Sequence, residues 1–284
     1  MRTISRLQKN ELRKLTGEKK MVLHIIDVSS HQAGILPSTV DCDGAIVKTT
    51  GGTNYVNRDC DPAMQDLFSC GKVAGIYHYA HEYGQYHPSE EEVSYFLSNS
   101  KGYLGKALLA LDYEQPINGA TYTQADVRWC AAFIQQVIHE TGIIPLLYCS
   151  KGLLTQLDWS SVANLNVGGW VAQYANNNPM GWDNDPWTDN KGFGAIVPVM
   201  YQYTSHGRIS GWNGNLDLNI FYGDQSAWNK FAKSASNNDG KPPLKNYLNE
   251  FAVDVLKGEY GNGVERKDNI YNAVQNAVNQ KLKQ

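Results

Sequence analysis

The sequence predicts an α/β fold, an irregular β/α barrel followed by a small C-terminal helical module. Two observations carry this prediction. Short apolar runs alternate with segments of helical spacing, which is the order that produces parallel strands. The length of 284 residues also exceeds the roughly 200–250 residues that one such barrel uses, which leaves room for a small appendage.

Apolar runs that each end at a polar or aromatic residue predict the strands of the barrel. They cover residues 22–26, 44–47, 73–79, 107–111, 143–147 and 169–173. The clearest helix is predicted over 124–140, where apolar residues recur every three or four positions. Later in the chain, 199–203 and 216–219 read as strands without clear helices between them, so we expect the barrel to be irregular.

Acidic, amide and aromatic side chains stand where these strands end. The set is Asp27, Asp112, Glu114, Tyr148, Tyr174, Gln202 and Asp217. In β/α barrels the loops that follow the strands form the active-site face. Several acids and rings that converge there would suit cleavage of a glycosidic bond, with an acid for the leaving oxygen and a negative group for the developing oxocarbenium ion.

The most informative segment is the apolar run that ends in Asp112 and Glu114. Side chains alternate along a strand, so these two acids should project from the same side. Two like charges held close raise the pKa of one of them, which suits a group that protonates a leaving oxygen near neutral pH. A structural alternative is that both acids cap the next turn.

Charge is distributed unevenly along the chain. Residues 1–20 carry seven bases and two acids, a net charge of +5, so the other 264 residues carry −8 to reach the total of −3. An acidic body argues against binding to nucleic acid, which needs a basic face. Seventeen tyrosines and seven tryptophans against seven phenylalanines favour surfaces that stack on sugar rings while hydrogen-bonding hydroxyl groups.

Localisation and redox state are predicted from what the sequence contains. No stretch approaches the roughly 18 apolar residues of a membrane span, and the basic start lacks the apolar centre of a secretory signal. We therefore expect a chain made in the cytoplasm without a signal peptide. The five cysteines show no Cys-x-x-Cys spacing and are expected to be mostly buried thiols. The sequence predicts no oligomeric state.

Five ordered motifs resemble the family 25 glycoside hydrolases. They are residues 27–32 (DVSSHQ), 75–80 (GIYHYA), 111–114 (LDYE), 170–174 (WVAQY), and 202–205 (QYTS) leading to 216–219 (LDLN). Proteins of that family are lysozymes, many of them phage endolysins, which cut the β-1,4 bond after N-acetylmuramic acid in peptidoglycan. The resemblance implies an enzyme of this kind that acts on the cell wall after release. We expect it to need no cofactor or metal.

Residue roles follow from the resemblance by position. Glu114 matches the general acid/base, and Asp112 matches the partner acid that orients or stabilises the acetamido group of the substrate. Asp27 and Asp217 match the two other acids of the cleft. The expected substrate-binding residues of the barrel are Tyr77, Tyr148, Trp170, Gln173, Tyr174 and Gln202. Inversion, a covalent intermediate and attack by the acetamido oxygen of the substrate all remain open.

Structural alternatives exist for several of these residues. Asp27 could cap the turn at Ser29, because Asp and Ser favour such turns. Three histidines at strand ends, at positions 31, 78 and 81, could bind a metal together with the acids, although no His-x-x-x-His spacing supports this. The tryptophans at 182, 187 and 212 could stack sugars or cover the end of the barrel.

The C-terminal part is predicted to be a separate module. A basic extension (1–21) and the catalytic barrel (22–233) are followed by a linker (234–243) whose composition is rich in Ser, Asn and Pro, and by helical spacing over 244–284. This last segment is similar to the family-7 cell-wall-binding repeats, small three-helix modules that recognise the muropeptide. The resemblance implies ligand contacts at Glu259, Tyr260 and Arg266.

This copy of the repeat departs from the pattern, because the stretch between Lys267 and Tyr271 is short and only one copy is present. Weak wall affinity is therefore expected, since tandem copies gain through effective concentration. The simpler alternative is a helical hairpin that packs on the barrel or mediates oligomerisation. For the whole chain, the alternatives to a peptidoglycan hydrolase are a metal-dependent deacetylase of the same polymer and a non-catalytic wall-binding protein.

Overall fold

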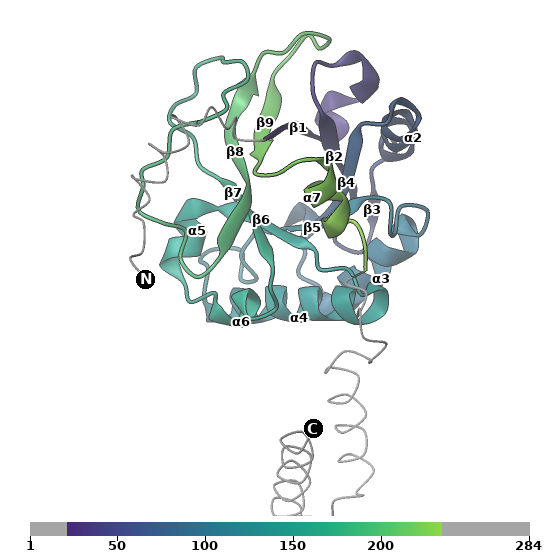
Figure 1. The fold of residues 1–284 in the computed structure, drawn as a ribbon. Coiled ribbons are helices and arrows are strands. Elements are labelled where there is room, and N and C mark those ends of the chain that lie inside the picture. Colours follow the sequence, from purple (N-terminus) through teal and green to yellow (C-terminus); the bar gives the residue numbers. More distant parts are fainter. Residues whose placement is uncertain (1–21, 235–284) are drawn as a thin grey trace, which may run out of the picture. The chain divides into compact units, whose positions relative to one another are not determined.

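Eight strands close into a barrel in the computed structural model, which describes residues 22–234 (Figure 1). The strands are β1 (Leu23–Val28), β2 (Gly44–Gly51), β4 (Val73–Tyr79), β5 (Leu108–Asp112), β6 (Leu146–Ser150), β7 (Gly168–Ala172), β8 (Val197–Gly207) and β9 (Leu216–Phe221). The short β3 (Tyr55–Val56) forms a hairpin with β2. The predicted fold class is confirmed for this part of the chain.

The barrel is irregular because of its last strand. From β1 through β2 and β4 to β8 the neighbouring strands pair in parallel, whereas β9 runs antiparallel to both β8 and β1. The first residues of β9, and not its last, therefore lie at the end of the barrel where the parallel strands finish. Asp217 at the start of β9 pairs in register with Asp27 near the end of β1.

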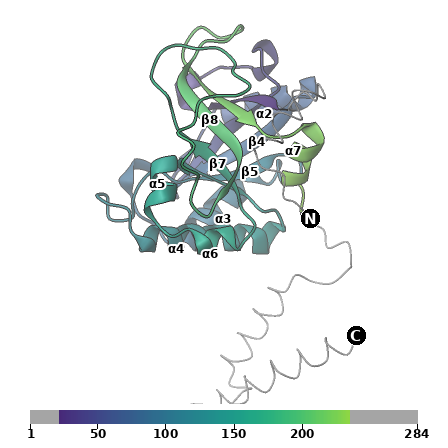
Figure 2. The same ribbon diagram turned by 60° about the vertical axis from the view of Figure 1, so that its left-hand side comes forward.

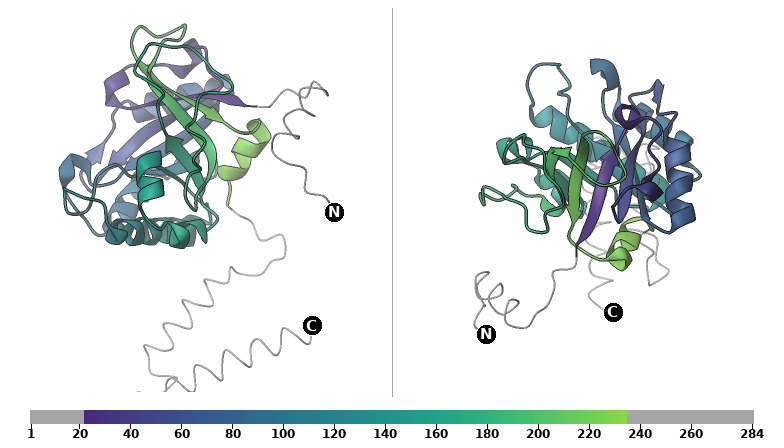
Figure 3. Two further views of the ribbon diagram at one scale, coloured as in Figure 1. Left: turned by 90° about the vertical axis from the view of Figure 1, so that its left-hand side faces the viewer. Right: turned by 90° about the horizontal axis from the view of Figure 1, so that it is seen from above.

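Helices cover the barrel unevenly. They are α2 (Cys60–Cys70), α3 (Ser89–Ser100), α4 (Gln124–Thr141), α5 (Lys151–Gln156), α6 (Ser160–Ala163) and α7 (Gln225–Phe231), with 3-10 turns η1 (Ser30–Gln32), η2 (Pro37–Thr39) and η3 (Glu82–Gly84). In Figure 1, α3, α4 and α6 lie along the lower side of the barrel and α2 lies on the right. Residues 173–196 connect β7 to β8 without a helix, and the views in Figures 2 and 3 show this connection as a loop beside β8.

The predicted helix over 124–140 is observed as α4. Its first turn is fixed by a capping box, in which the Thr123 side chain accepts from the backbone and the Asp126 carboxylate accepts from the Thr123 N–H. The helix ends at Gly142, whose φ of 70° places it in the left-handed region that glycine adopts easily. Sequence signals at both ends therefore set the length of this helix.

Strand alternation divides the apolar side chains into two cores. One fills the barrel interior and the other lies between the strands and the helices. Trp228 of α7 closes the end opposite the pocket described below, with its indole N–H donating to the carbonyl of Ala74 at 3.0 Å. A Cβ atom at Gly75 would lie 2.8 Å from Ile46, so only glycine lets these groups pack here.

Several sequence predictions concern segments beyond these described residues. The basic extension, the linker and the C-terminal repeat lie outside 22–234, apart from the first linker residue, and so do Glu259, Tyr260 and Arg266. Within 22–234 no helix is long and apolar enough to cross a membrane. All five cysteines are free thiols, three of them buried, as expected.

Candidate active site

A single pocket of about 810 Å³ at the end of the parallel strands brings the four predicted acids together. Asp27 comes from β1, Asp112 and Glu114 from the end of β5 and the loop that follows it, and Asp217 from β9. These positions are nearly 200 residues apart in sequence, and the closed barrel makes them neighbours. The pocket is therefore the candidate active site.

The period of the strands explains why polar groups gather in this pocket. Inward-facing positions on β1 and β5 carry apolar side chains deep in the barrel and a carboxylate at the last inward position, Asp27 and Asp112. On β2 the same position holds Lys48, two residues after the inward-facing Ile46. The sequence thus changes from apolar to charged where the barrel opens to solvent.

Asp27 is held by two amides. One of its oxygens accepts from Gln202 Nε2 at 2.9 Å and from Asn219 Nδ2 at 2.7 Å. The Oε1 atom of Gln202 in turn accepts the hydroxyl groups of Tyr148 at 2.8 Å and Tyr174 at 2.5 Å. All these groups are buried or half-buried, so the network fixes the orientation of the Asp27 carboxyl group.

The Asp112 and Glu114 side chains form a coupled pair. Burial raises the pKa of Asp112 well above its usual range, and the charges of Glu114 and Asp27 raise it further. The pKa of Glu114 is also raised, first by desolvation, while a hydrogen bond from Asp112 and the charge of Lys48 act against this rise. A hydrogen bond between two carboxyl groups needs a proton, so the pair retains one to a higher pH than separate acids would.

The pKa values of the other two acids, Asp27 and Asp217, are raised as well. Desolvation raises the pKa of Asp27 to about 6, although the two amide hydrogen bonds oppose it. Desolvation and the nearby charge of Asp27 raise the pKa of Asp217 to about 8. Asp217 therefore keeps its proton at neutral pH and Asp27 loses its own first, so that the two acids differ in charge state around pH 7.

Lys48 is a pocket residue that the sequence reasoning did not single out. Its Nζ atom lies 2.5 Å from Glu82 Oε2, and it stands over the rings of Tyr55 and Tyr79 at 4.8 and 4.4 Å from their centroids. This ammonium group lowers the pKa of both Asp112 and Glu114. The available signal was strand alternation, because Lys48 follows Ile46 at the spacing that faces the barrel interior.

Five of the six barrel residues expected to bind substrate line the pocket. They are Tyr77, Tyr148, Trp170, Tyr174 and Gln202. The sixth, Gln173, does not, and its Oε1 atom accepts the hydroxyl of Tyr201 at 3.3 Å. Trp170 faces the barrel interior. Side chains alternate along a strand, so Gln173, three positions later, points away from the interior. Gln173 is thus the one expected substrate-binding residue of the barrel that does not line this pocket.

The described part of the chain shows where several residues with structural alternatives lie. The cap of η1 is Ser29, whose hydroxyl accepts from the His31 N–H, so Asp27 is free for the pocket. His78 and His81 both contact the buried Glu92 outside the barrel interior, and within 22–234 no group of three or more His, Cys, Asp or Glu side chains could hold a metal. Trp182 stacks on His24 with ring centroids 4.4 Å apart and does not line the pocket.

Two protein-family models match this chain. The model of the glycosyl hydrolases family 25 matches residues 26–212, and that of the CW_7 repeat matches residues 249–282. The lysozyme of Streptococcus phage Cp-7 is 28% identical over 268 residues, which cover 90% of this chain and 69% of that protein.

Solved structures share the fold. A bacterial lysozyme from Streptomyces coelicolor aligns with a TM-score of 0.60 at 21% identity, over 77% of this chain and 100% of its own. The catalytic domain of endolysin ply40 from bacteriophage P40 of Listeria monocytogenes aligns with a TM-score of 0.56 at 24% identity, over 76% of this chain and 100% of its own. Since the family model spans well over half of its residues, this chain belongs to the glycosyl hydrolases family 25.

Proposed function

We propose that this glycoside hydrolase is a lysozyme that cuts the β-1,4 bond between N-acetylmuramic acid and N-acetylglucosamine in peptidoglycan, and that it serves a phage or prophage as an endolysin. The observation that carries the proposal is the convergence of four acids with raised pKa values in one pocket. Glycoside hydrolysis needs one carboxyl group that keeps a proton and another that carries negative charge beside it.

Glu114 is the proton donor in this proposal. It is the most exposed of the four acids, at the opening of the pocket, where the oxygen of a leaving sugar can reach it. The raised pKa keeps a proton available, and the neighbouring Asp112 shares that proton in the absence of substrate. Transfer of the proton to the glycosidic oxygen lets the bond break without expelling an alkoxide.

Asp112 is suited to a second task. It is only 5% exposed, and its Oδ1 atom has no hydrogen-bond partner among the described residues. A buried carboxyl oxygen that accepts no hydrogen bond is costly, and the N–H of an acetamido group would satisfy it. Asp112 would thereby orient the acetamido group of the substrate, while the charge of Asp27 stabilises the positive charge that develops on the sugar ring.

Similarity to phage proteins supports the biological setting. The Cp-7 relative is a phage lysozyme, and the CW_7 repeat match covers the segment that resembles wall-binding modules. We propose that the barrel cleaves the glycan and that the segment after it holds the enzyme on the wall, with Glu259, Tyr260 and Arg266 in contact with the muropeptide. Synthesis in the cytoplasm and action after release belong to the same proposal.

Mass spectrometry of digested cell walls tests the reaction. We expect new reducing ends at N-acetylmuramic acid with the wild-type chain, and a loss of about 10²–10⁴-fold in rate with Glu114→Gln. Glu140→Gln, an exposed acid on α4, is the matched control and should leave the rate unchanged. Reducing ends at glucosamine, or loss of acetyl groups that a chelator prevents, would refute the assignment, as would full activity of Glu114→Gln.

A further inference from the structure

The pocket has an aromatic side that the cleavage chemistry does not use. Tyr55 of β3 and Tyr83 of η3, which we call the tyrosine rim, both line the pocket and meet edge to face with their ring centroids 6.2 Å apart. Tyr83 is 70% exposed, more than any other large hydrophobic side chain in the described residues. An aromatic ring that stands in solvent at the wall of a binding pocket is available to stack on a ligand.

The backbone that carries Tyr83 is strained. Tyr83 has a φ of 58° and His81 a φ of 54°, both in the left-handed region. For a bulky side chain this conformation costs free energy and persists only where the surrounding structure enforces it. Contacts with the rest of the protein must therefore hold the loop in this conformation, and such contacts are present at both of its ends.

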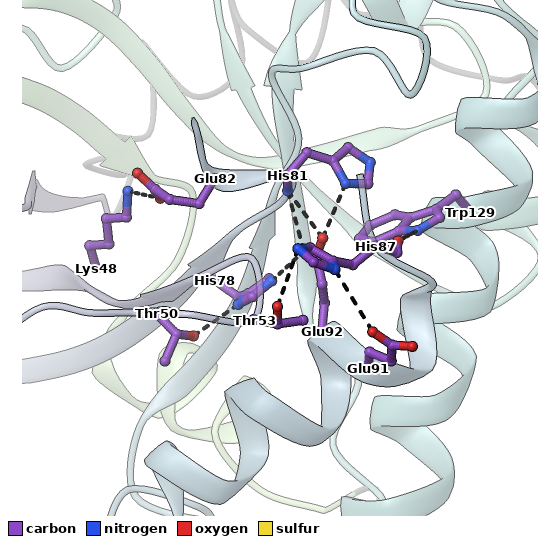
Figure 4. Close-up of polar contacts among 10 residues, drawn as sticks. All are labelled: Lys48, Thr50, Thr53, His78, His81, Glu82, His87, Glu91, Glu92 and Trp129. Atoms are coloured by element: carbon purple, nitrogen blue, oxygen red, sulfur yellow. Dashed lines mark hydrogen bonds and ion pairs between the residues drawn. The ribbon is translucent and has the colours of Figure 1, made fainter. Parts of the chain in front are cut away.

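A buried network fixes the first end of the loop (Figure 4). The Glu92 carboxylate of α3 accepts the backbone N–H of His81 at 3.3 Å and contacts the Nδ1 atom of the same residue at 3.1 Å. Its other oxygen lies 2.7 Å from His78 Nε2, and His78 Nδ1 lies 2.8 Å from Thr50 Oγ1. All these side chains are buried, so the network fixes the conformation of the loop where it begins after β4.

The second end is held by His87. Its ring contacts Thr53 Oγ1 at 3.2 Å, and its carbonyl accepts the indole N–H of Trp129 at 2.9 Å. Between the two ends, Glu82 pairs with Lys48, whose Nζ atom also lies 4.8 Å from the centroid of the Tyr55 ring. Figure 4 shows the Glu82–Lys48 pair to the left of Glu92. The loop is thus tied at three places, and the ring of Tyr83 at its tip is exposed, with only its edge-to-face contact to Tyr55 described.

We propose that the tyrosine rim is a saccharide subsite that stacks on a sugar of the glycan strand beyond the two that flank the cleaved bond. The inference rests on the proposed function. The rim is continuous with the pocket of the four acids, but it stands on the β2–β3 hairpin and the β4–α3 loop and not on the strands that carry those acids. Charged groups that line the same pocket, Lys48 and Glu82, suit the hydroxyl groups of a sugar whose apolar face lies on a tyrosine ring.

Kinetics on peptide-free glycan oligosaccharides of increasing length test the subsite in the full chain. Tyr83→Asn removes the ring but suits a left-handed backbone, so it should not unfold the loop. We expect kcat/KM to fall about three- to tenfold on long oligosaccharides and to stay unchanged on the shortest one that is cleaved. Tyr83→Phe, which keeps the ring, should retain the wild-type rate.

Tyr86→Asn is the matched control. Tyr86 belongs to the same loop and is 50% exposed, but its ring lies against His81 and outside the pocket, so its loss should not change the length dependence. Equal loss at every length for Tyr83→Asn, or no loss, would overturn the subsite. A loss seen only on peptide-bearing strands would assign the rim to the stem peptide instead. If the wild-type chain cleaves no oligosaccharide, the proposed function itself fails.

Discussion

The Asp27 carboxyl group accepts hydrogen bonds from neutral amides and not from a cation, and the type of partner affects its pKa. An arginine or lysine in contact would hold the pKa well below 4, whereas Gln202 and Asn219 offset desolvation only in part and leave the pKa at about 6. The carboxylate is thus oriented and poorly neutralised, which is what stabilisation of a positive transition state requires.

Replacing Gln202 by Met tests this arrangement. The change keeps the volume but removes the hydrogen bond that lowers the pKa of Asp27 and the acceptor for Tyr148 and Tyr174. We expect the limb of the pH–rate profile that Asp27 controls to move to higher pH, and kcat/KM at neutral pH to fall about tenfold, the equivalent of ~1.4 kcal/mol. An unchanged profile would mean that Gln202 does not tune Asp27.

Asp217 links the pocket to stability. Its pKa is raised from 3.8 to about 8, so the folded state binds more protons than the unfolded state between these values. Stability from this group is present below about pH 4 and is lost as pH rises through 8. Asp217→Asn should therefore flatten the decline over this range and raise stability at pH 8 by at least ~1.4 kcal/mol. Urea denaturation of both proteins at pH 5 and pH 8 checks this, and an equal decline in both would contradict it.

The four acids could be predicted from sequence because each lies at a strand end and inside a recognisable motif. Gln173 was expected beside them but does not line the pocket, since a motif gives neighbouring positions without stating which side of the strand each one faces. Glu82 escaped notice for another reason. It lies in a loop where two residues other than glycine adopt a positive φ, and its partner Lys48 is 34 positions away. No local pattern encodes a pairing of that kind.

Among the elements, the β4–α3 loop depends on one buried carboxylate. Glu92 is fully buried and serves two histidines and a backbone N–H, whereas its neighbour Glu91 is exposed and lies 3.8 Å from His87. The two adjacent acids of α3 therefore form a natural comparison. Removing the charge of Glu92 should cost more stability than removing that of Glu91. Water can replace the partner of an exposed charge but not that of a buried one.

We expect Glu92→Gln to lower the free energy of unfolding by about 3 kcal/mol, because an NH2 group, which cannot accept, replaces one of the two carboxylate oxygens that serve buried histidine groups. Glu91→Gln should change it by less than ~0.5 kcal/mol. Urea unfolding of both variants at pH 7, followed by tryptophan fluorescence, gives the two values. Similar values for the pair would show that the network does not stabilise the loop.

The strands and the long helix were predictable because their signals are local. The predicted runs agree with β1, β2 and β4 to β7 to within a few residues, and α4 is bounded by a capping box and a glycine. The closure of the barrel was not visible in this way. It depends on β9, which follows β8 directly in the chain, also pairing antiparallel with β1, a strand almost 200 residues away.

At the scale of the whole molecule, the chain combines a family 25 barrel with a segment that matches a CW_7 repeat. A soluble oligosaccharide meets only the pocket, whereas an intact wall also presents sites to which a second module can bind. If the C-terminal segment is a wall anchor, its contribution arises through effective concentration at the wall and not through the chemistry of the cleavage step. The two substrates therefore separate the two roles.

A chain that ends at residue 234 provides this separation. We expect it to cleave short glycan oligosaccharides with the kcat/KM of the full chain, because every pocket residue lies within 22–234. On intact walls we expect the amount bound at equilibrium, measured by co-sedimentation, to fall several-fold, with a parallel loss in the rate at which turbidity clears. Arg266→Ala in the full chain should reproduce part of that loss. Equal binding of the long and short chains would remove the wall-anchor role, whereas slower cleavage of oligosaccharides by the short chain would show that the segment supports the barrel itself.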